Sequence, residues 1–566
     1  MNPNQLLTHF DRISQAPDAI PRLRRFILDL AVRGKLVEQD PRDEPASKLL
    51  KRIQTEKTRL VKAGGIRKMK TLPSIEDEET PFTVPTNWDW VRLNDITSYI
   101  QRGKSPKYAT TEGLPVISQK CVQWIGLNLH FAKLITRESI EGYDTIRFLL
   151  SGDLLWNSTG TGTIGRIIKV KEPPPKLVCD SHVTVVRCLE VDAEYVRSWL
   201  RSDHVYADIE DRAAGSTNQV ELTSQLAMNQ VVPLPPLAEQ HRIVAKVDEL
   251  MGLCDRLETA QTERESQRDR LVASSLNHLN NGADADAFQD HARFYFNHLP
   301  RLTTRPAHIK QLRQTILNLA VRGKLVPQNP IDEPASMLLE RIVYLTTEGQ
   351  NIPKRMHPFD LEALPFELPV FWEWVQVQDL CRPSSMITYG VLKPVWVDTG
   401  VPTVRVKDMQ GGELDVENVG QCSRERAAKF AKTTLETGDL LIAKDGATLG
   451  KTAFVPPSLA GGNITQHVLR FPMTQHVVSL FVRLVIDSPH GQAWMRSETK
   501  GVALPGVNVG DFRRMPIPLP PLAEQHRIVA KVEELMTLCN QLETQLTTTQ
   551  TETRHLLEAV LYETLA

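Results

Sequence analysis

Apolar residues recur at alternating intervals of four and three along two long stretches of the chain. The first stripe is Ile243, Val247, Leu250, Cys254 and Leu257, and the second is Ile528, Val532, Leu535, Cys539 and Leu542, continued by Leu546, Leu556 and Val560. This spacing is typical of a coiled-coil seam. Polar residues interrupt the first seam at Gln261, Arg264 and Arg268 before Leu271 restores it. A helix running on to Leu279 would be about 65 Å long at ~1.5 Å per residue, so we expect two strut-like helices.

A shorter amphipathic helix is predicted ahead of each long one. Its apolar face is Leu23, Phe26, Ile27 and Leu30 in the first copy and Leu312, Ile316 and Leu319 in the second. Gly34 and Gly323 are suited to ending these helices, and the following "DEPAS" starts another, with Pro45 or Pro334 in its first turn. The segments Glu76–Thr80 and Asn280–Asp286 are predicted to be linkers.

The two sets of helices belong to a direct tandem duplication. "PLPPLAEQHRIVAKV" occurs at Pro233–Val247 and again at Pro518–Val532, and the two prolines before each leucine suit the entry of a helix. Further repeated pairs stand in the same order in both halves: "ILDLAVRGKLVEQDPRDEPASKLLKRI" and "ILNLAVRGKLVPQNPIDEPASMLLERI", "NWDWV" and "FWEWV", two copies of "GDLL", and His182 with His467. Repeats of this length predict one architecture built twice.

Between the repeated words the halves diverge, since Ser98–Ser151 and Met386–Thr437 share almost nothing. Short β-branched runs punctuated by Gly and Pro predict a mixed α/β domain in each half, with helices near Tyr195–Leu200 and Val477–Ile486. The divergence is either drift in surface loops or the same kind of task performed on two targets. We expect an α+β protein: two mixed α/β domains separated by long antiparallel coiled-coil helices, with an internal pseudo-twofold duplication.

Composition narrows the class of protein. Hydrophobic residues make up 41% and charged residues 24% of the 566, as in soluble globular proteins. The seven cysteines show no metal-ligand or disulfide spacing, which favours a reducing cytoplasm, and neither a membrane span nor a signal peptide is expected. Lys plus Arg (67) nearly equals Asp plus Glu (68), which excludes a strongly basic nucleic-acid coat but allows local positive charge.

Two glycine loops resemble nucleotide-binding motifs. "GTGTIG" at Gly160–Gly165 matches the dinucleotide fingerprint, and "GATLGKT" at Gly446–Thr452 is one residue short of a phosphate-binding loop. Both motifs require a following helix, whereas "RIIKVKEPPPK" and "AFVPP" are β-type or proline-broken. We therefore expect glycine β-turns whose cations could touch a phosphate backbone. No catalytic or metal motif is present, and His182 and His467 are interpreted as satisfied structural histidines.

The repeated words closely resemble those of the specificity subunit of type I restriction-modification systems. They are the two copies of "PLPPLAEQHRIVAKV", "LAVRGKLV" followed by "DEPAS", and the "TNWDWV" and "FWEWV" entries to the divergent domains. The resemblance implies a non-enzymatic chain whose two target recognition domains each read half of a split DNA site. The expected boundaries are an N-terminal helical region at 1–80, recognition domains at 81–235 and 351–520, a helical spacer at 236–350 and a C-terminal coiled-coil helix at 521–566.

The resemblance also implies partners. Helical spacers would hold the readers apart and bind two methylation subunits, which carry S-adenosylmethionine and methylate adenine, while restriction subunits using ATP and Mg would join through them. This chain would hold no cofactor of its own and no metal, and it would bind no membrane. A nucleotide-dependent enzyme and a DNA-binding scaffold of a methylation-only or other defence assembly remain as alternatives.

Base and phosphate recognition needs local cations and amides. The candidate DNA-binding residues are Arg102, Lys104, Lys107, Gln119, Lys120, Asn157, Ser158, Thr159 and Arg166 in the first half, and Lys393, Arg405, Lys407, Lys444, Lys451 and Gln466 in the second. The candidate partner-binding residues flank the seam and are Glu239, Gln240, Arg242, Glu524, Gln525 and Arg527.

Overall fold

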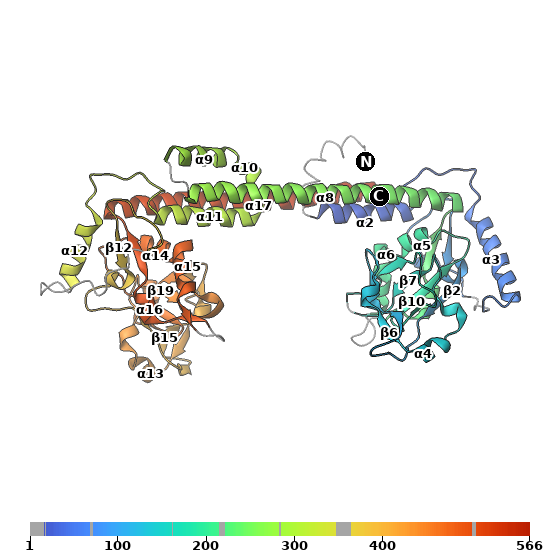
Figure 1. Ribbon diagram of the computed structural model, residues 1–566, viewed down its shortest axis with the longest axis horizontal. Coiled ribbons are helices and arrows are strands. Elements are labelled where there is room, and N and C mark those ends of the chain that lie inside the picture. Colours follow the sequence, from blue (N-terminus) through green and yellow to red (C-terminus); the bar gives the residue numbers. More distant parts are fainter. Residues whose placement is uncertain are drawn as a thin grey trace. The chain divides into compact units, whose positions relative to one another are not determined.

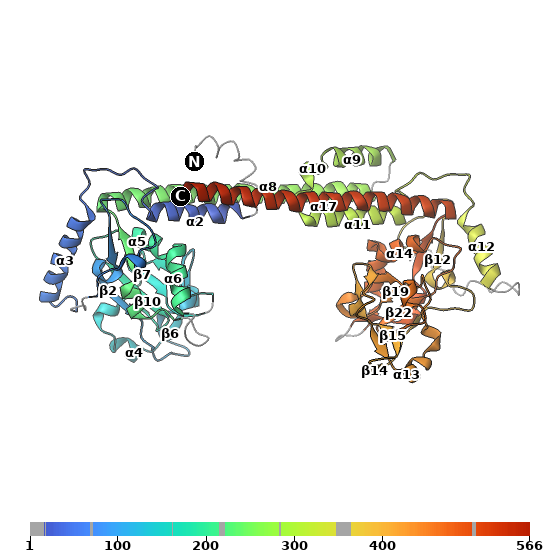
Figure 2. The same ribbon diagram turned by 180° about the vertical axis from the view of Figure 1, so that it is seen from behind.

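The computed structural model describes residues 16, 18–67, 72–160, 162–213, 221–281, 285–346, 364–500 and 505–565. The chain forms two compact units, one of Met1–Glu263 with Gln550–Ala566 and the other of Arg264–Thr549. In each unit a mixed α/β domain lies against helices (Figures 1 and 2). No helix in these described ranges is long and apolar enough to span a membrane.

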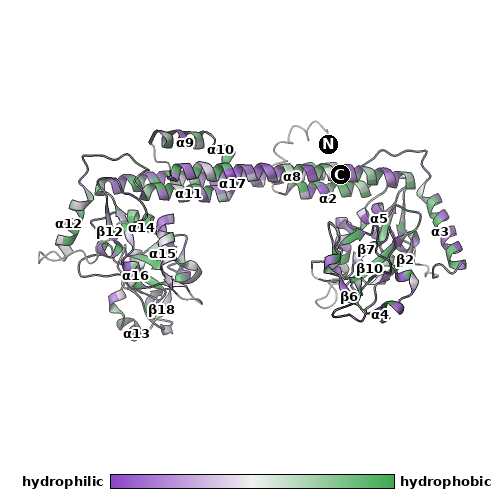
Figure 3. Cartoon of the chain, in the orientation of Figure 1, coloured by the Kyte–Doolittle hydropathy of each residue, from purple (hydrophilic) through white to green (hydrophobic). Residues whose placement is uncertain are grey.

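Two very long helices run through the chain, α8 (Leu237–Asn281) and α17 (Leu522–Leu565). Each gives its N-terminal part to one unit and its C-terminal part to the other. The middle of α8 is mainly hydrophilic (Figure 3), where the sequence predicts an interrupted seam. The expected long helices are confirmed, but the predicted linker at Asn280–Asp286 is wrong at both ends, because α8 continues to Asn281 and α9 starts at Ala285.

In the first unit, α2 (Ala19–Val32) packs on the beginning of α8. The apolar contact is made by Ile20, Ile27, Leu28 and Ala31 with Ile243, Val247 and Cys254. The end of α17 completes this bundle, since Leu557 packs on Ala16 and Ala19. A polar contact joins the same two helices where Arg22 pairs with Glu558 at 2.8 Å.

The second unit repeats this arrangement with the long helices exchanged. Here α11 (Pro306–Val321) packs on the beginning of α17 and the end of α8, through Leu312 and Ile316 with Ile528, Val532, Cys539, Val272, Leu276 and Leu279. The two long helices are antiparallel where they pack in this unit (Figure 1). Each short helix is therefore covered by the start of one long helix and the end of the other.

The first mixed domain is built around a four-stranded antiparallel sheet in the order β2-β10-β7-β8. A second sheet, β6-β3-β9, contains one parallel pair, β3 with β9. The strands are β1 (Asp89–Arg92), β2 (Thr97–Arg102), β3 (Leu114–Ile117), β4 (Val122–Gln123), β5 (Gly126–Leu127), β6 (Lys133–Ile135), β7 (Leu154–Asn157), β8 (Ile167–Lys169), β9 (Val178–Cys179), β10 (Val183–Cys188) and β11 (Val231–Leu234). The other helices of this unit are α3 (Ala46–Lys62), α4 (Arg137–Glu141), α5 (Ala193–Leu200), α6 (Asp203–Ala213) and α7 (Ser224–Asn229).

The second mixed domain has a matching sheet in the order β13-β22-β19-β20 and a second sheet, β14-β18-β15-β21, whose β15 and β21 are parallel. The strands are β12 (Glu373–Gln376), β13 (Thr388–Tyr389), β14 (Trp396–Val397), β15 (Val401–Val404), β16 (Met409–Gln410), β17 (Glu413–Leu414), β18 (Gly420–Cys422), β19 (Leu440–Ala443), β20 (Thr452–Phe454), β21 (Asn463–Ile464), β22 (Val468–Phe471), β23 (Thr499–Lys500), β24 (Gly506–Val507) and β25 (Pro516–Leu519). The other helices of this unit are α9 (Ala285–Asn297), α10 (Leu299–Leu302), α12 (Ala335–Thr346), α13 (Arg424–Ala428), α14 (Ser479–Asp487), α15 (Pro489–Ser497) and α16 (Val509–Arg513).

The divergent segments therefore fold alike, which confirms two mixed α/β domains on one duplicated plan. The predicted helices near Tyr195–Leu200 and Val477–Ile486 are α5 and α14. The predicted linker at Glu76–Thr80 has a more defined role than expected. It forms a short 3-10 turn at Asp77–Glu79, and the Glu79 carboxylate accepts two hydrogen bonds of 2.7 Å from the buried Arg92 guanidinium.

A buried carboxylate joins each domain to its helices. In the first unit, the Trp88 indole donates to Glu239 Oε2 at 3.0 Å and the Gln39 amide donates to Glu239 Oε1 at 2.6 Å. In the second unit, Trp372 and Gln328 make the same bonds to Glu524, again at 3.0 and 2.6 Å. We call each set the Trp–Glu–Gln joint. Burial raises the pKa of both carboxyl groups, and the hydrogen bonds from tryptophan and glutamine oppose the rise.

The neighbouring repeated residues complete the joint. The Gln240 side chain accepts from the Asp192 backbone N–H at 2.8 Å and donates to the Pro235 carbonyl at 2.9 Å, and Gln525 repeats both bonds with Val478 and Pro520. Arg242 pairs with Asp43 at 2.6 Å, as Arg527 does with Asp332 at 2.7 Å.

These contacts correct four of the expected partner-binding residues. The side chains of Glu239, Gln240, Glu524 and Gln525 are at most 1% exposed. Their polar groups are bonded inside their own unit, so they cannot face another subunit. Arg242 and Arg527 remain partly exposed and stay predictions.

Replacing Glu239 by alanine should destabilise the first unit. The change leaves the Trp88 indole N–H and the Gln39 amide without their acceptor, and a buried unsatisfied donor costs about 1–3 kcal/mol. We expect the free energy of unfolding to fall by about 2–4 kcal/mol, measured by urea denaturation. Glu249→Ala, which removes an exposed pair with Lys246 on the same helix, serves as the control and should change it by less than about 1 kcal/mol. Equal effects of the two changes would contradict the role of the joint.

Candidate DNA interface

The candidate residues of the first half gather at one end of its central sheet. The register pairs Arg102 with Thr184, Asn157 with Val183, and Trp156 with Ile167. Strands β2 and β7 therefore end, and β8 and β10 begin, at the same end of the sheet. The loops that follow or precede these strand ends form a single surface, which we call loop cluster 1.

Hydrogen bonds fix the centre of loop cluster 1. The Asn157 amide donates to the Gln119 carbonyl at 3.0 Å, and Ser158 and Thr184 share a 2.6 Å bond. The Thr159 hydroxyl lies 3.1 Å from Gln119 Oε1 and 2.7 Å from His182 Nδ1. Asn157 and Ser158 are completely buried, which corrects their assignment as DNA contacts, because they hold the loops from beneath.

The predicted cations of the first half fall into two groups: arginines bonded within the domain and lysines exposed to solvent. The Arg102 guanidinium donates to the Ser181 carbonyl at 2.9 Å and pairs with Glu221, while Arg166 donates to Gln123 at 3.2 Å and to the Gly162 carbonyl at 2.8 Å. Both guanidinium groups thus brace the loops. Three ammonium groups are exposed and make no ion pair within the described residues: Lys104, Lys107 and Lys120.

The second half has an equivalent surface, loop cluster 2, formed by the loops at the end of the central sheet where β19 ends and β22 begins. Its exposed cations, also without an ion pair in the described ranges, are Lys393, Lys407 and Lys451. Arg405 is held by Asp408 through two bonds of 3.0 Å and lies over the Trp396 ring at 5.2 Å. Lys444 is also engaged, because its ammonium lies 2.9 Å from both oxygens of Asp445.

The strand pairing reveals equivalent positions in the two halves that are not apparent from the repeated sequence segments. Ile117 and Val404 occupy equivalent positions, since each pairs in parallel with the strand that precedes the histidine. Lys120 then matches Lys407 and Gln123 matches Gln410, and each glutamine amide donates to the lysine carbonyl, at 2.7 and 3.3 Å. In the sequence, the two segments share only a β-branched pair followed by a Lys-x-x-Gln spacing. This pattern is too short to align the halves unless the register of the parallel strands is known.

The glycine loops are turns between strands, as expected. Gly160–Gly165 is followed by β8 and Gly446–Thr452 leads into β20, so neither precedes a helix that could hold a pyrophosphate. The backbone at Gly165 and Gly450 is left-handed, with φ of 81° and 82°. Both loops thus carry the conformation that favours glycine in tight turns.

Each repeated histidine is hydrogen-bonded to the residue just before its glycine loop. The His182 ring bonds to Thr159, and His467 Nδ1 lies 2.8 Å from Asp445 Oδ2. Gln466 Nε2 lies 3.0 Å from His467 Nε2. Both histidines are therefore hydrogen-bonded. Each links its glycine loop to the strand that begins directly after the histidine.

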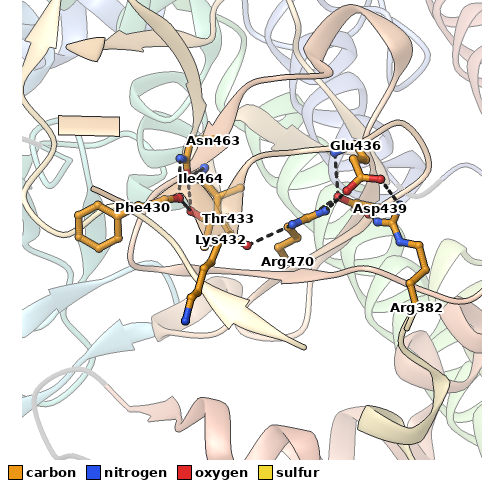
Figure 4. A network of polar contacts seen from close by, with 9 residues as sticks. All are labelled: Arg382, Phe430, Lys432, Thr433, Glu436, Asp439, Asn463, Ile464 and Arg470. Atoms are coloured by element: carbon orange, nitrogen blue, oxygen red, sulfur yellow. Dashed lines mark hydrogen bonds and ion pairs between the residues drawn. The ribbon is translucent and has the colours of Figure 1, made fainter. Parts of the chain in front are cut away.

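A buried ionic network (Figure 4) lies at the end of the central sheet opposite to loop cluster 2, where β19 begins and β22 ends. Asp439, the aspartate of the second "GDLL", accepts from Arg470 Nε at 2.5 Å and pairs with Arg382, and Glu436 pairs with both arginines. Burial raises the pKa of the Asp439 carboxyl group, and hydrogen bonds from the Glu436 backbone and Arg470 oppose the rise. Asp153, its counterpart, holds Arg187 at 2.7 Å. The repeated aspartate thus binds an arginine in each half.

Comparison with known proteins matches this duplicated arrangement. The family model "Type I restriction modification DNA specificity domain" matches residues 85–265 and 369–549. The EcoAI specificity subunit of Escherichia coli is 31% identical, over 96% of this chain and 93% of that protein, and the EcoEI specificity subunit of the same organism is 29% identical over the same shares. The HsdS subunit from Thermoanaerobacter tengcongensis is 19% identical with a TM-score of 0.43, covering 86% of this chain and 98% of that one.

Removing the buried carboxylate of the Figure 4 network should be far more damaging than removing the exposed one. Asp439→Ala leaves the buried Arg470 guanidinium partly uncompensated, which typically costs about 3–5 kcal/mol. The control is Glu436→Ala, which removes a carboxylate that is 61% exposed and should cost at most about 1 kcal/mol. Thermal and urea unfolding would measure both, and equal losses would show that burial does not set the strength of this network.

Proposed function

As a member of the type I restriction modification DNA specificity family, this chain is a specificity subunit with two recognition domains, and we propose that each domain reads one half of a bipartite duplex DNA site. The chain performs no catalysis. Its role is to choose the site at which a methylation subunit, and through it a restriction subunit, acts.

The main support is the contrast between the two loop clusters. The strands beneath them match in order and register, whereas the exposed side chains above them differ apart from the matched Lys120 and Lys407. A shared scaffold with different surface groups suits two readers of different half-sites. Exposed lysines at the rim (Lys104, Lys107 and Lys120, or Lys393, Lys407 and Lys451) would contact phosphates, while neutral polar groups between them would meet base edges.

The partners follow from the same proposal. Two methylation subunits would bind one chain, because the helical frame is built twice, and S-adenosylmethionine would reside on them. ATP and Mg would be used by restriction subunits attached through the methylation subunits, in the cytoplasm. Arg242 and Arg527, which are partly exposed beside the Trp–Glu–Gln joints, are the remaining candidates for this contact.

Removing the three free lysines of loop cluster 1 should flatten the salt dependence of DNA binding. Each lost phosphate contact lowers the slope of log affinity against log salt by about 0.9, so Lys104→Ala, Lys107→Ala and Lys120→Ala together should lower it by up to about 2.7. The measurement is a titration of the assembled complex with duplex DNA at several salt concentrations. The control is Lys51→Ala, which removes an exposed lysine of α3, away from the loop cluster. An unchanged slope in the triple variant would place the phosphate backbone elsewhere.

Exchanging one domain should change one half of the recognised sequence. If residues 98–232 are replaced by the equivalent segment of another family member, the methylated sites should retain the half-site read by the second domain. Sequencing of methylated adenines in the host genome, with and without the exchange, provides the readout. A change in both halves, or in neither, would contradict one reader per domain.

Size measurement of the assembled complex should also give two methylation subunits per chain.

A further inference from the structure

Gln466 occupies an unusually well-fixed position in loop cluster 2. It lies in the turn between β21 and β22, and its backbone N–H donates to the Val391 carbonyl at 3.1 Å. The preceding residue, Thr465, donates to the Val404 carbonyl at 3.0 Å. The start of β21 is held in turn by Asn463, whose side chain accepts from Thr433 at 2.5 Å (Figure 4). The backbone around Gln466 is therefore held from two sides, by β15 at Val404 and by the segment after β13 at Val391.

The side-chain amide of Gln466 is oriented by a chain of hydrogen bonds. Asp445 can only accept a hydrogen bond, so the His467 nitrogen facing it, Nδ1 at 2.8 Å, carries the proton. In the neutral ring Nε2 is then an acceptor, and the group 3.0 Å from it must be the amide nitrogen of Gln466 rather than its oxygen. Lys444 holds Asp445 by bonds of 2.9 Å to both carboxylate oxygens.

This arrangement leaves two groups of Gln466 available. One N–H of its amide is used by His467, and in the part of the chain that the structure describes no partner meets the second N–H or the amide oxygen. The side chain is half-buried, so these groups lie at the surface of loop cluster 2. An oxygen acceptor and an N–H donor, side by side and held in place, match the N6 donor and N7 acceptor of adenine in the major groove.

We propose that Gln466 reads an adenine in the half-site of the second domain and that His467 is the positioning residue that fixes its amide. This inference rests on the proposed function and names one base contact within it. The amide carries no charge, and the charge of Asp445 is already matched by Lys444, which suits a base edge better than a phosphate.

The first domain carries the same histidine with a different group in this place. The residue before His182 is Ser181, whose hydroxyl is 3.0 Å from that of Ser105. Its short side chain offers no amide, and the His182 ring bonds instead to Thr159, next to Gln119. The shared histidine therefore supports different groups in the two domains, and the adenine contact belongs to the second domain alone.

The test uses the chain assembled with its methylation subunits. Methylated sites are mapped for the unaltered chain, and duplexes with each base pair of that site substituted are then compared in competition binding. In Gln466→Ala, discrimination should fall by about 5- to 150-fold at one A·T pair of one half-site, because a bidentate contact contributes about 1–3 kcal/mol. All other positions should keep their preference. In Gln466→Glu, which has two acceptors and no donor, the same position should shift towards cytosine.

His467→Ala should relax the same base pair as Gln466→Ala, and the double variant should be no worse than Gln466→Ala alone, because the histidine acts through the glutamine. A merely structural role would instead add a further loss at other positions. The matched control is His182→Ala, which should alter only the other half-site. Because Gln466→Glu keeps the shape of the side chain, it gives the answer even if the alanine variant assembles poorly.

The inference is overturned if both Gln466 variants keep the original preference at every base pair, or if they relax a pair in the half-site of the first domain. The proposed function fails separately, since it requires the unaltered chain to direct methylation to a bipartite sequence at all.

Discussion

The architecture of each unit depends on one buried carboxylate, Glu239 or Glu524. A charge with so little access to water is tolerated only when donors surround it, and two of these donors come from distant parts of the chain. The Trp88 indole is 151 residues away and the Gln39 amide 200 residues away. The carboxylate therefore fixes three segments at once: the turn after the short helix, the entry to the domain and the start of the long helix.

This constraint accounts for the sequence segments that are repeated in the two halves of the chain. Gln39 and Gln328 follow "LAVRGKLV", Trp88 and Trp372 lie in the entry to each domain, and Glu239 and Glu524 lie in "PLAEQHR". The left-handed Gly34 and Gly323 belong to the same contact, since a Cβ there would lie 2.6 and 2.5 Å from Pro85 and Pro369. Residues that must fit together in three dimensions cannot change singly, and this explains near-identity in the frame beside divergence in the loops.

Much of the fold was predictable because it depends on local pattern. The 4-3 stripe identified α8 and α17, and the prolines and β-branched runs after the glycine loops excluded nucleotide-binding helices. The site was less predictable, because polar side chains such as Asn157 and Glu239 look alike in sequence whether they face solvent or bond to a distant segment. The match of Lys120 with Lys407 likewise needed the parallel strand pairs, since only a few residues are shared around it.

The exchange of long helices between the units has a consequence for how the protein is made. The first unit includes Gln550–Ala566, and Leu557 covers Ala16 and Ala19 at its opposite end in the sequence. While the ribosome is still adding the second half, that apolar patch on the nascent chain has no cover of its own. The first unit therefore begins to form before the second half of the chain is made, and it is completed only when the C-terminal part of α17 packs on Ala16 and Ala19.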